Sequence, residues 1–190
     1  GALTINNAQY FERSEYLWEK GTDRSLVVKG IKNKYSWVDF GSSFLTSDIL
    51  SALLYSQFEN IDKLQEKRKN LHDAYMKVFS KLKKFGLRIL FVPDKIEPNY
   101  HAFWLLFNNE NQRDNFISLS LAKGISPYIG YMPLHSSPMG KKLGGDRYNL
   151  PVTVHVSSSV VRLPFYLMSD SEIEYVCINL SKIAKIALGK

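Results

Sequence analysis

The sequence predicts an α+β fold in which short strands and helices follow one long helical segment. The first observation is a mostly apolar stripe at helical spacing from about Ser47 to Lys84, with hydroxyl residues available to cap its start and Gly86 placed to end it. The second is that strand-like and helix-like segments alternate after this glycine. The third is the length of 190 residues, which is enough to bury a core.

The long helical segment has two interpretations. It exceeds about 25 residues, the length at which a helix of a globular protein normally ends. It is therefore either one helix that links two lobes or two helices separated by a bend.

The region before this segment is predicted to contain a strand, a helix and a loop. Ala2 to Ile5 has the composition of a short strand. Asn6 or Asn7 can cap a helix that runs to about Lys20, where a glycine ends it. Thr22 to Ser43 lacks periodicity but contains several aromatic residues, which indicates an ordered loop, and long ordered loops are usually functional.

The region after Gly86 is predicted to contain strands, capped helices and loops. Strands are expected at Leu87–Val92, His101–Phe107 and Val160–Leu163. Helices are expected after Asn109 and Ser169, because each is followed three residues later by Gln or Glu, the pattern of a capping box. Pro127–Pro133 is expected to be irregular or extended, and Ser136–Asn149, rich in Gly, Ser and Lys, to be a mobile loop.

The composition argues against several classes of protein. No stretch approaches the ~18 apolar residues that a membrane span needs. The net charge of +7 is spread along the chain, and its densest cluster, Lys63 to Lys69, has the spacing of a solvated helix face, so we expect neither a nucleic-acid nor a membrane partner. A single cysteine, Cys177, forms no disulfide framework, and no signal peptide is visible, which favours the cytoplasm.

Metal and nucleophile patterns are missing from the sequence. The four histidines do not pair at a ligand spacing, so no metal site is expected. Cys177 lies on or near the apolar face of the last helix, which favours a buried, inert thiol. The chain begins with Gly1 in the middle of a predicted strand, so we expect it to be part of a longer protein.

Three segments carry residues that are unusual for plain scaffold. Asp39–Ser43 places a glycine and two serines before the long helix, which suits either a phosphate site or a simple helix cap. Tyr131–His135 presents an aromatic ring and an imidazole on a proline-fixed segment, or is a turn with a buried tyrosine. Arg162–Tyr166 begins with an arginine, for which a structural ion pair is the favoured interpretation.

These segments, together with others, occur in the order of a known family. The motifs are Glu19–Arg24, Lys34–Ser43, Ser47–Asp48, Asn99–Phe103, Tyr131–His135 and Arg162–Tyr166. In this order and at this spacing they resemble the DegT/StrS group of sugar aminotransferases, over nearly the whole chain. The resemblance implies the C-terminal part of the aspartate-aminotransferase-like (type I PLP) fold, with both α/β and α+β character: residues 1–45 end the large cofactor domain, 46–85 form a long linking helix and 86–190 a small α+β domain.

The resemblance also implies a reaction. Members of the family transfer an amino group with pyridoxal 5′-phosphate (PLP), and the lysine that forms the Schiff base would lie upstream of Gly1, so no catalytic residue is expected in this chain. The implied reaction moves an amino group from L-glutamate to the 4-keto group of a dTDP-4-keto-6-deoxyhexose. The implied assembly is a homodimer with active sites at the subunit interface.

The resemblance assigns binding roles to a supporting set of residues. Ser43, with Ser42 as second choice, matches a position that reaches the PLP phosphate of the partner subunit; many family members have asparagine there. Residues near the sugar nucleotide would be Arg24, Lys29, Lys34, Tyr35, Tyr131 and His135, with the three cations directed to its diphosphate. The alternative function is a non-catalytic module that binds a sugar nucleotide or another protein.

Overall fold

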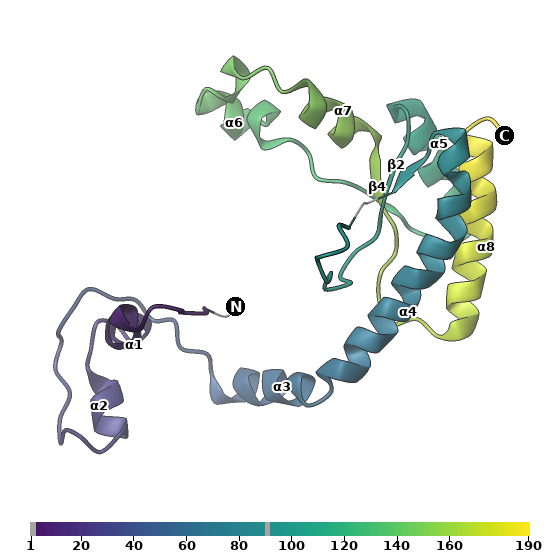
Figure 1. Ribbon diagram of the computed structural model, residues 1–190. Coiled ribbons are helices and arrows are strands. Elements are labelled where there is room, and N and C mark those ends of the chain that lie inside the picture. Colours follow the sequence, from purple (N-terminus) through teal and green to yellow (C-terminus); the bar gives the residue numbers. More distant parts are fainter. Residues whose placement is uncertain (1–2, 90–91) are drawn as a thin grey trace. The chain divides into compact units, whose positions relative to one another are not determined.

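The computed structural model describes residues 3–89 and 92–190 (Figure 1). The chain divides into two compact units, residues 1–59 and 60–190. The predicted division at residues 45 and 85 stays a prediction.

The first unit consists of short helices and a long loop. Its helices are the 3-10 helix η1 (Ala8–Tyr10), α1 (Phe11–Trp18), α2 (Arg24–Val28) and α3 (Asp48–Phe58). The predicted cap is confirmed, since the Asn7 side chain accepts a hydrogen bond from the Gln9 amide at 3.0 Å. The strand predicted over Ala2–Ile5 is wrong for residues 3–5, which pair with no neighbouring strand among the described residues, and Ala2 lies outside them.

The long helical segment consists of two helices separated by a bend, as in the second of the two predicted alternatives. α3 ends at Phe58 and α4 (Ile61–Phe79) begins after Asn60, whose backbone has φ −112° and ψ 11°, outside the helical region. A 3-10 helix, η2 (Ser80–Phe85), continues α4 to Gly86, which takes the left-handed conformation at φ 92°. Asparagine interrupts the helix because its short polar side chain favours turns and caps over helix interiors.

The second unit contains one antiparallel sheet of four short strands. These are β1 (Arg88–Ile89), β2 (Trp104–Leu106), β3 (Tyr128–Ile129) and β4 (Val160–Arg162), in the order β1-β2-β4-β3. The strands predicted at 87–92, 101–107 and 160–163 are therefore confirmed at their centres, with residues 90 and 91 outside the described part. β3 lies in the segment predicted to be irregular or extended.

The second unit also contains helices after the first strand. They are α5 (Glu110–Leu121), η3 (Leu134–Ser136), α6 (Pro138–Lys142), η4 (Gly145–Arg147), α7 (Pro151–Ser159) and α8 (Asp170–Ala187). The loop predicted over 136–149 is wrong in part, because short helical turns occupy it. α7 was not predicted: its valines, threonine and serines have low helix propensity, although Pro151 suits a first turn.

The core of the second unit lies between the sheet and the helices α4, α5 and α8. Leu105 and Val161 point from the central strands into this core, and both are fully buried. α4 and α8 run side by side (Figure 1) and contribute Tyr75 and Leu180, which are also fully buried. The expectation for Cys177 is confirmed: the thiol is buried in this core, and burial raises its pKa to about 11.

The predicted capping box at the start of α8 is present in full. The Ser169 hydroxyl oxygen accepts from the Glu172 amide at 3.4 Å, and the Glu172 carboxylate accepts from the Ser169 amide at 2.7 Å. The Ser169 amide, and then its hydroxyl, lower the pKa of Glu172. A carboxyl whose pKa is depressed in the folded state stabilises the fold above its unfolded pKa and loses that contribution as the pH falls.

Replacing the capping serine should therefore cost stability in a pH-dependent way. We expect Ser169→Ala to lower the free energy of unfolding by about 1 kcal/mol at neutral pH. The loss should shrink as the pH falls through the titration of Glu172, as measured by urea denaturation at neutral and acidic pH. Ser181→Ala, in the middle of α8 where the hydroxyl donates to the Ile178 carbonyl, is the control. An equal loss in both variants would contradict a role for the cap.

Candidate functional site

The loop of the first unit is held by close backbone contacts around Gly21. Its amide donates to the Tyr16 carbonyl at 2.7 Å, and its carbonyl accepts from the Val38 amide at 2.8 Å and the Asp39 amide at 3.0 Å. Gly21 has φ 75°, and a side-chain carbon there would lie 1.7 Å from the Asp39 carbonyl oxygen. Only glycine fits this position, so the helix end and the 37–43 segment are fixed together.

Ser42 and Ser43 lie beside the end of α1. The Lys20 amide donates to the Ser42 carbonyl at 3.0 Å, and Ser43 forms a β-bridge with Glu19. Both serines are exposed. The interpretation of Asp39–Ser43 as a simple helix cap is wrong, because α3 begins at Asp48 and its cap is Ser47, where the long helical segment was predicted to start.

Two of the three cations predicted to bind a diphosphate form ion pairs with glutamates. Arg24 Nη1 lies 2.7 Å from Glu19 Oε1, and Lys29 Nζ lies 2.6 Å from Glu15 Oε1. The hydrogen bond from Lys29 lowers the pKa of Glu15, so this carboxylate stays ionised. Lys34 and Tyr35 are exposed, and Lys34 has no ion pair within the described part of the chain. A diphosphate would have to compete with carboxylates for Arg24 and Lys29.

A buried carboxylate that sequence analysis missed organises this loop. Asp23 is 1% exposed and accepts from the Ser36 amide at 2.5 Å and from the Lys32 ammonium. These partners, Lys32 first, lower the pKa of Asp23. The carboxylate therefore joins the start of α2 to the segment after it. Asp23 lies within the Glu19–Arg24 motif, but its place two residues after Gly21 is too common a pattern to predict this role.

The other two predicted site residues lie in the second unit. Tyr131 is 80% exposed, and its ring centroid lies 6.5 Å from that of Trp104. His135 is half-buried in η3. The tight packing of this segment depends on Gly140, since a side-chain carbon there would lie 1.8 Å from the Leu134 carbonyl oxygen. The structure thus groups six predicted site residues in one unit and two in the other.

A cavity of about 880 Å³ lies at the edge of the sheet in the second unit. Strands β2, β3 and β4 line it together with the start of α8, and Trp104, Tyr131 and Arg162 are among its residues. The ion pair favoured for Arg162 is absent: no carboxylate in the described ranges lies within 4.0 Å of its guanidinium. Trp104 and Arg162 are site candidates that the sequence alone did not bring together.

Among residues 3–89 and 92–190, no group of three His, Cys, Asp or Glu side chains is placed to hold a metal ion. In the same ranges, every helix is too short or too polar to cross a lipid bilayer.

Comparison with known proteins gives consistent results. The profile of the DegT/DnrJ/EryC1/StrS aminotransferase family matches residues 1–181. The UDP-4-amino-4,6-dideoxy-N-acetyl-beta-L-altrosamine transaminase of Campylobacter jejuni is 25% identical over 148 residues, which are 77% of this chain and 38% of that protein.

Solved structures match over almost the whole chain. A protein assigned as the sugar aminotransferase Spr1654 of Streptococcus pneumoniae, in its PMP form, has a TM-score of 0.80 at 20% identity, covering 96% of this chain and 47% of that one. The aminotransferase of Psychrobacter cryohalolentis has a TM-score of 0.82 at 15% identity, covering 95% and 50%. These matches confirm the predicted aspartate-aminotransferase-like fold class. The chain spans half or less of the length of these relatives.

Proposed function

Because this chain belongs to the DegT/DnrJ/EryC1/StrS aminotransferase family, we propose that it is the C-terminal part of a PLP-dependent nucleotide-sugar aminotransferase. The observation that carries the proposal is the family match over residues 1–181 of 190. The similarity to a transaminase of a UDP-linked amino sugar agrees with it. The chain spans about half the length of the solved relatives. We place the lysine that binds the cofactor in the half of the parent protein that this chain does not include.

The residues present fit the phosphate end of the cofactor. Within the described part of the chain, the hydroxyls of Ser42 and Ser43 have no hydrogen-bond partner, and both are exposed on a loop that Gly21 holds rigid. Each hydroxyl can donate a hydrogen bond to a phosphate oxygen. Bound PLP would supply the electron sink for amino transfer. The role of this part of the protein is then to hold the phosphate and the substrates in place.

We take the reaction to be amino transfer from L-glutamate to the 4-keto group of a dTDP-4-keto-6-deoxyhexose. Serine at position 43 and the motif order resemble the dTDP-4-amino-4,6-dideoxygalactose transaminases, which supports this acceptor. The UDP-sugar named for the Campylobacter relative is the competing acceptor. A homodimer with active sites at the interface and a cytoplasmic location complete the proposal.

The test is an assay of the complete reading frame that contains this chain. The full protein should bind PLP and release 2-oxoglutarate from L-glutamate when the dTDP-linked keto sugar is present. The 190-residue chain alone should transfer no amino group. Full-length protein that binds no PLP, or turnover by the short chain alone, would contradict the proposal. Turnover with only the UDP-linked keto sugar would replace the acceptor and keep the reaction.

The exposed apolar face of α3 predicts self-association of the 190-residue chain. Its large apolar side chains are all at least half exposed: Ile49, Leu50, Leu53, Leu54, Tyr55 and Phe58. Contiguous apolar surface of this kind promotes association. We expect a dimer or larger species by light scattering at micromolar concentration.

A paired substitution tests this origin of the association. Leu53→Glu with Leu54→Glu should shift the chain toward monomer, because it places charge on the apolar face. Gln57→Glu adds charge at a polar position of the same helix and should leave the association unchanged. A monodisperse wild-type monomer would contradict the prediction.

A further inference from the structure

Strand register places an arginine between two aromatic residues on one face of the sheet. Trp104 of β2 and Tyr128 of β3 both lie opposite Arg162 of β4. Side chains that are directly opposite in antiparallel strands share a face and lie close together. The neighbouring residues Leu105 and Val161 point to the opposite face, into the core. This trio therefore faces away from the core.

The guanidinium of Arg162 is held in place but not neutralised. Its Cζ lies 5.7 Å from the centroid of the Trp104 ring, within the range of a cation–π contact. Among the described residues, its guanidinium donates a hydrogen bond to the His101 carbonyl at 3.5 Å, at the limit of hydrogen-bonding distance. An arginine stacked on an indole keeps its edge N–H groups for an oxyanion, which it can bind with two parallel hydrogen bonds.

The cavity around this trio has the size and lining of a ligand site. Its volume of about 880 Å³ falls within the range of small-molecule pockets, roughly 300–1,000 Å³. Tyr131 lies at its edge with the ring 80% exposed. The cavity also contains one carboxylate, Glu172, but that group accepts from the Ser169 amide and hydroxyl at the start of α8. These donors and the Tyr166 hydroxyl, at 3.4 Å, hold the carboxylate, which stays ionised, and Arg162 is the cationic side chain of the lining.

We infer that this cavity binds the nucleoside diphosphate part of the sugar nucleotide, with Arg162 on the diphosphate and the rings of Trp104 and Tyr131 beside the base. The inference rests on the proposed function for the choice of ligand class. Flat bases stack on aromatic rings, and diphosphates bind guanidinium groups. Arg162 is the better diphosphate ligand than Arg24 or Lys29, because each of those already pairs with a glutamate.

Calorimetric titration of the 190-residue chain with dTDP tests the inference without PLP or turnover. Arg162→Ala should weaken dTDP binding about 10- to 100-fold, the effect of losing hydrogen bonds to a charged group. Trp104→Leu should weaken dTDP more than it weakens inorganic pyrophosphate, which has no base. Arg68→Ala is the matched control and should not change binding, since this arginine of α4 lies outside the cavity and donates to the Gln65 side chain at 3.0 Å.

The variant Arg162→Lys tests whether weaker binding comes from the lost guanidinium and not from a loss of the fold. It keeps the charge and the strand but loses the planar fork, so binding should be weakened while the circular dichroism spectrum stays that of the wild type. Equal dTDP affinity in wild type and both Arg162 variants, or no dTDP binding by wild type, would overturn the inference. Binding of L-glutamate instead of dTDP, lost in Arg162→Ala, would assign the site to a carboxylate and also overturn it. These outcomes are separate from those that test the proposed function, which are PLP binding and amino transfer by the full protein and the absence of turnover by the short chain.

Discussion

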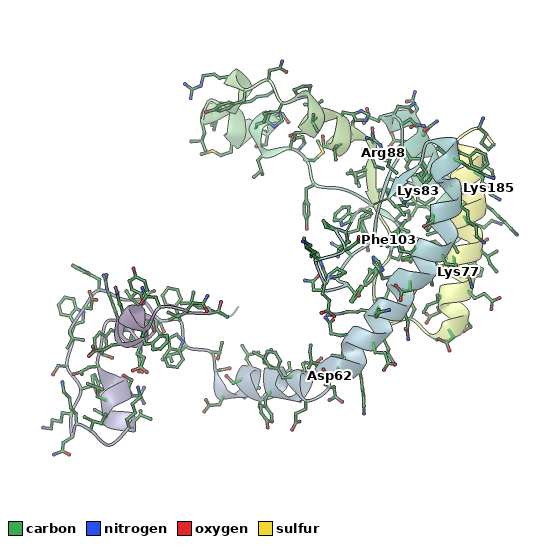
Figure 2. All side chains as sticks on the ribbon, in the orientation of Figure 1. Asp62, Lys77, Lys83, Arg88, Phe103 and Lys185 are labelled. Carbon is green, nitrogen blue, oxygen red and sulfur yellow. The ribbon has the colours of Figure 1, made fainter. Side chains whose placement is uncertain are left out.

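Replacing Phe103 by alanine should lower the free energy of unfolding of the second unit by about 3–5 kcal/mol. Phe103 is 2% exposed and lies in the core beside α4 (Figure 2). Its ring centroid lies 5.2 Å from that of Tyr75, 5.3 Å from that of His72 and 6.2 Å from that of Phe79. The substitution leaves a cavity that three packed rings on α4 cannot close without moving.

The expected loss is measured by urea denaturation followed by circular dichroism. Tyr148→Ala is the control, because Tyr148 belongs to the same unit but is 63% exposed. Its effect should stay within about 0.5 kcal/mol. A loss below 1 kcal/mol for Phe103→Ala would show that the core relaxes around the vacancy, and the aromatic cluster would then not be the centre of stability.

Predictions from the sequence succeeded where neighbours along the chain decide the structure. The cap at Ser169 needs only Glu172 three residues later, and the Asn109 side chain caps α5 through the Gln112 amide at 3.0 Å. The box predicted at Asn109 is nevertheless incomplete, because the Gln112 side chain accepts from the Asn108 amide and not from the Asn109 amide. Gly86 ends the helical segment because glycine, unlike residues with a side-chain carbon, adopts a left-handed backbone without strain. These features depend on spacing, which the sequence contains in full.

Predictions failed where contacts between distant segments decide the structure. α7 forms from residues that favour strands, so its helical state comes from its surroundings and from Pro151. Leu3 to Ile5 form no strand because a strand exists only with a partner. A pairing of residues far apart in sequence cannot be seen from either alone.

The same limit applies to the candidate site. Asp23 is buried by residues up to 13 positions away, and Trp104 meets Arg162 across 58 positions of sequence through strand register. The resemblance in motif order identified the loop that contains Ser42 and Ser43, but not the carboxylates that pair with Arg24 and Lys29. Charge pairing is set by geometry, so the sequence overstated how many cations are free.

Replacing Gly21 by alanine should displace the segment 37–43, which contains the proposed phosphate ligands Ser42 and Ser43. Alanine at φ 75° costs about 1–2 kcal/mol of backbone strain. The added carbon would also lie 1.7 Å from the Asp39 carbonyl oxygen, a separation that no folded arrangement tolerates. The segment must therefore move away and give up the hydrogen bonds from the Val38 and Asp39 amides to the Gly21 carbonyl. We expect the Val38 amide to lose its protection from hydrogen exchange.

The control Gly30→Ala distinguishes the effect of backbone strain from the effect of the steric clash with Asp39. Gly30 has nearly the same backbone conformation, φ 73°, but no atom lies within 4 Å of the position that an added carbon would take. Gly30→Ala therefore carries the strain alone and should change the protection of Val38 by no more than about tenfold, the equivalent of 1.4 kcal/mol. Gly21→Ala should abolish that protection and, in the full protein, weaken PLP binding, because Ser42 and Ser43 lose their fixed position. Equal effects of the two substitutions would mean that backbone strain, and not the contact between Gly21 and Asp39, holds the loop.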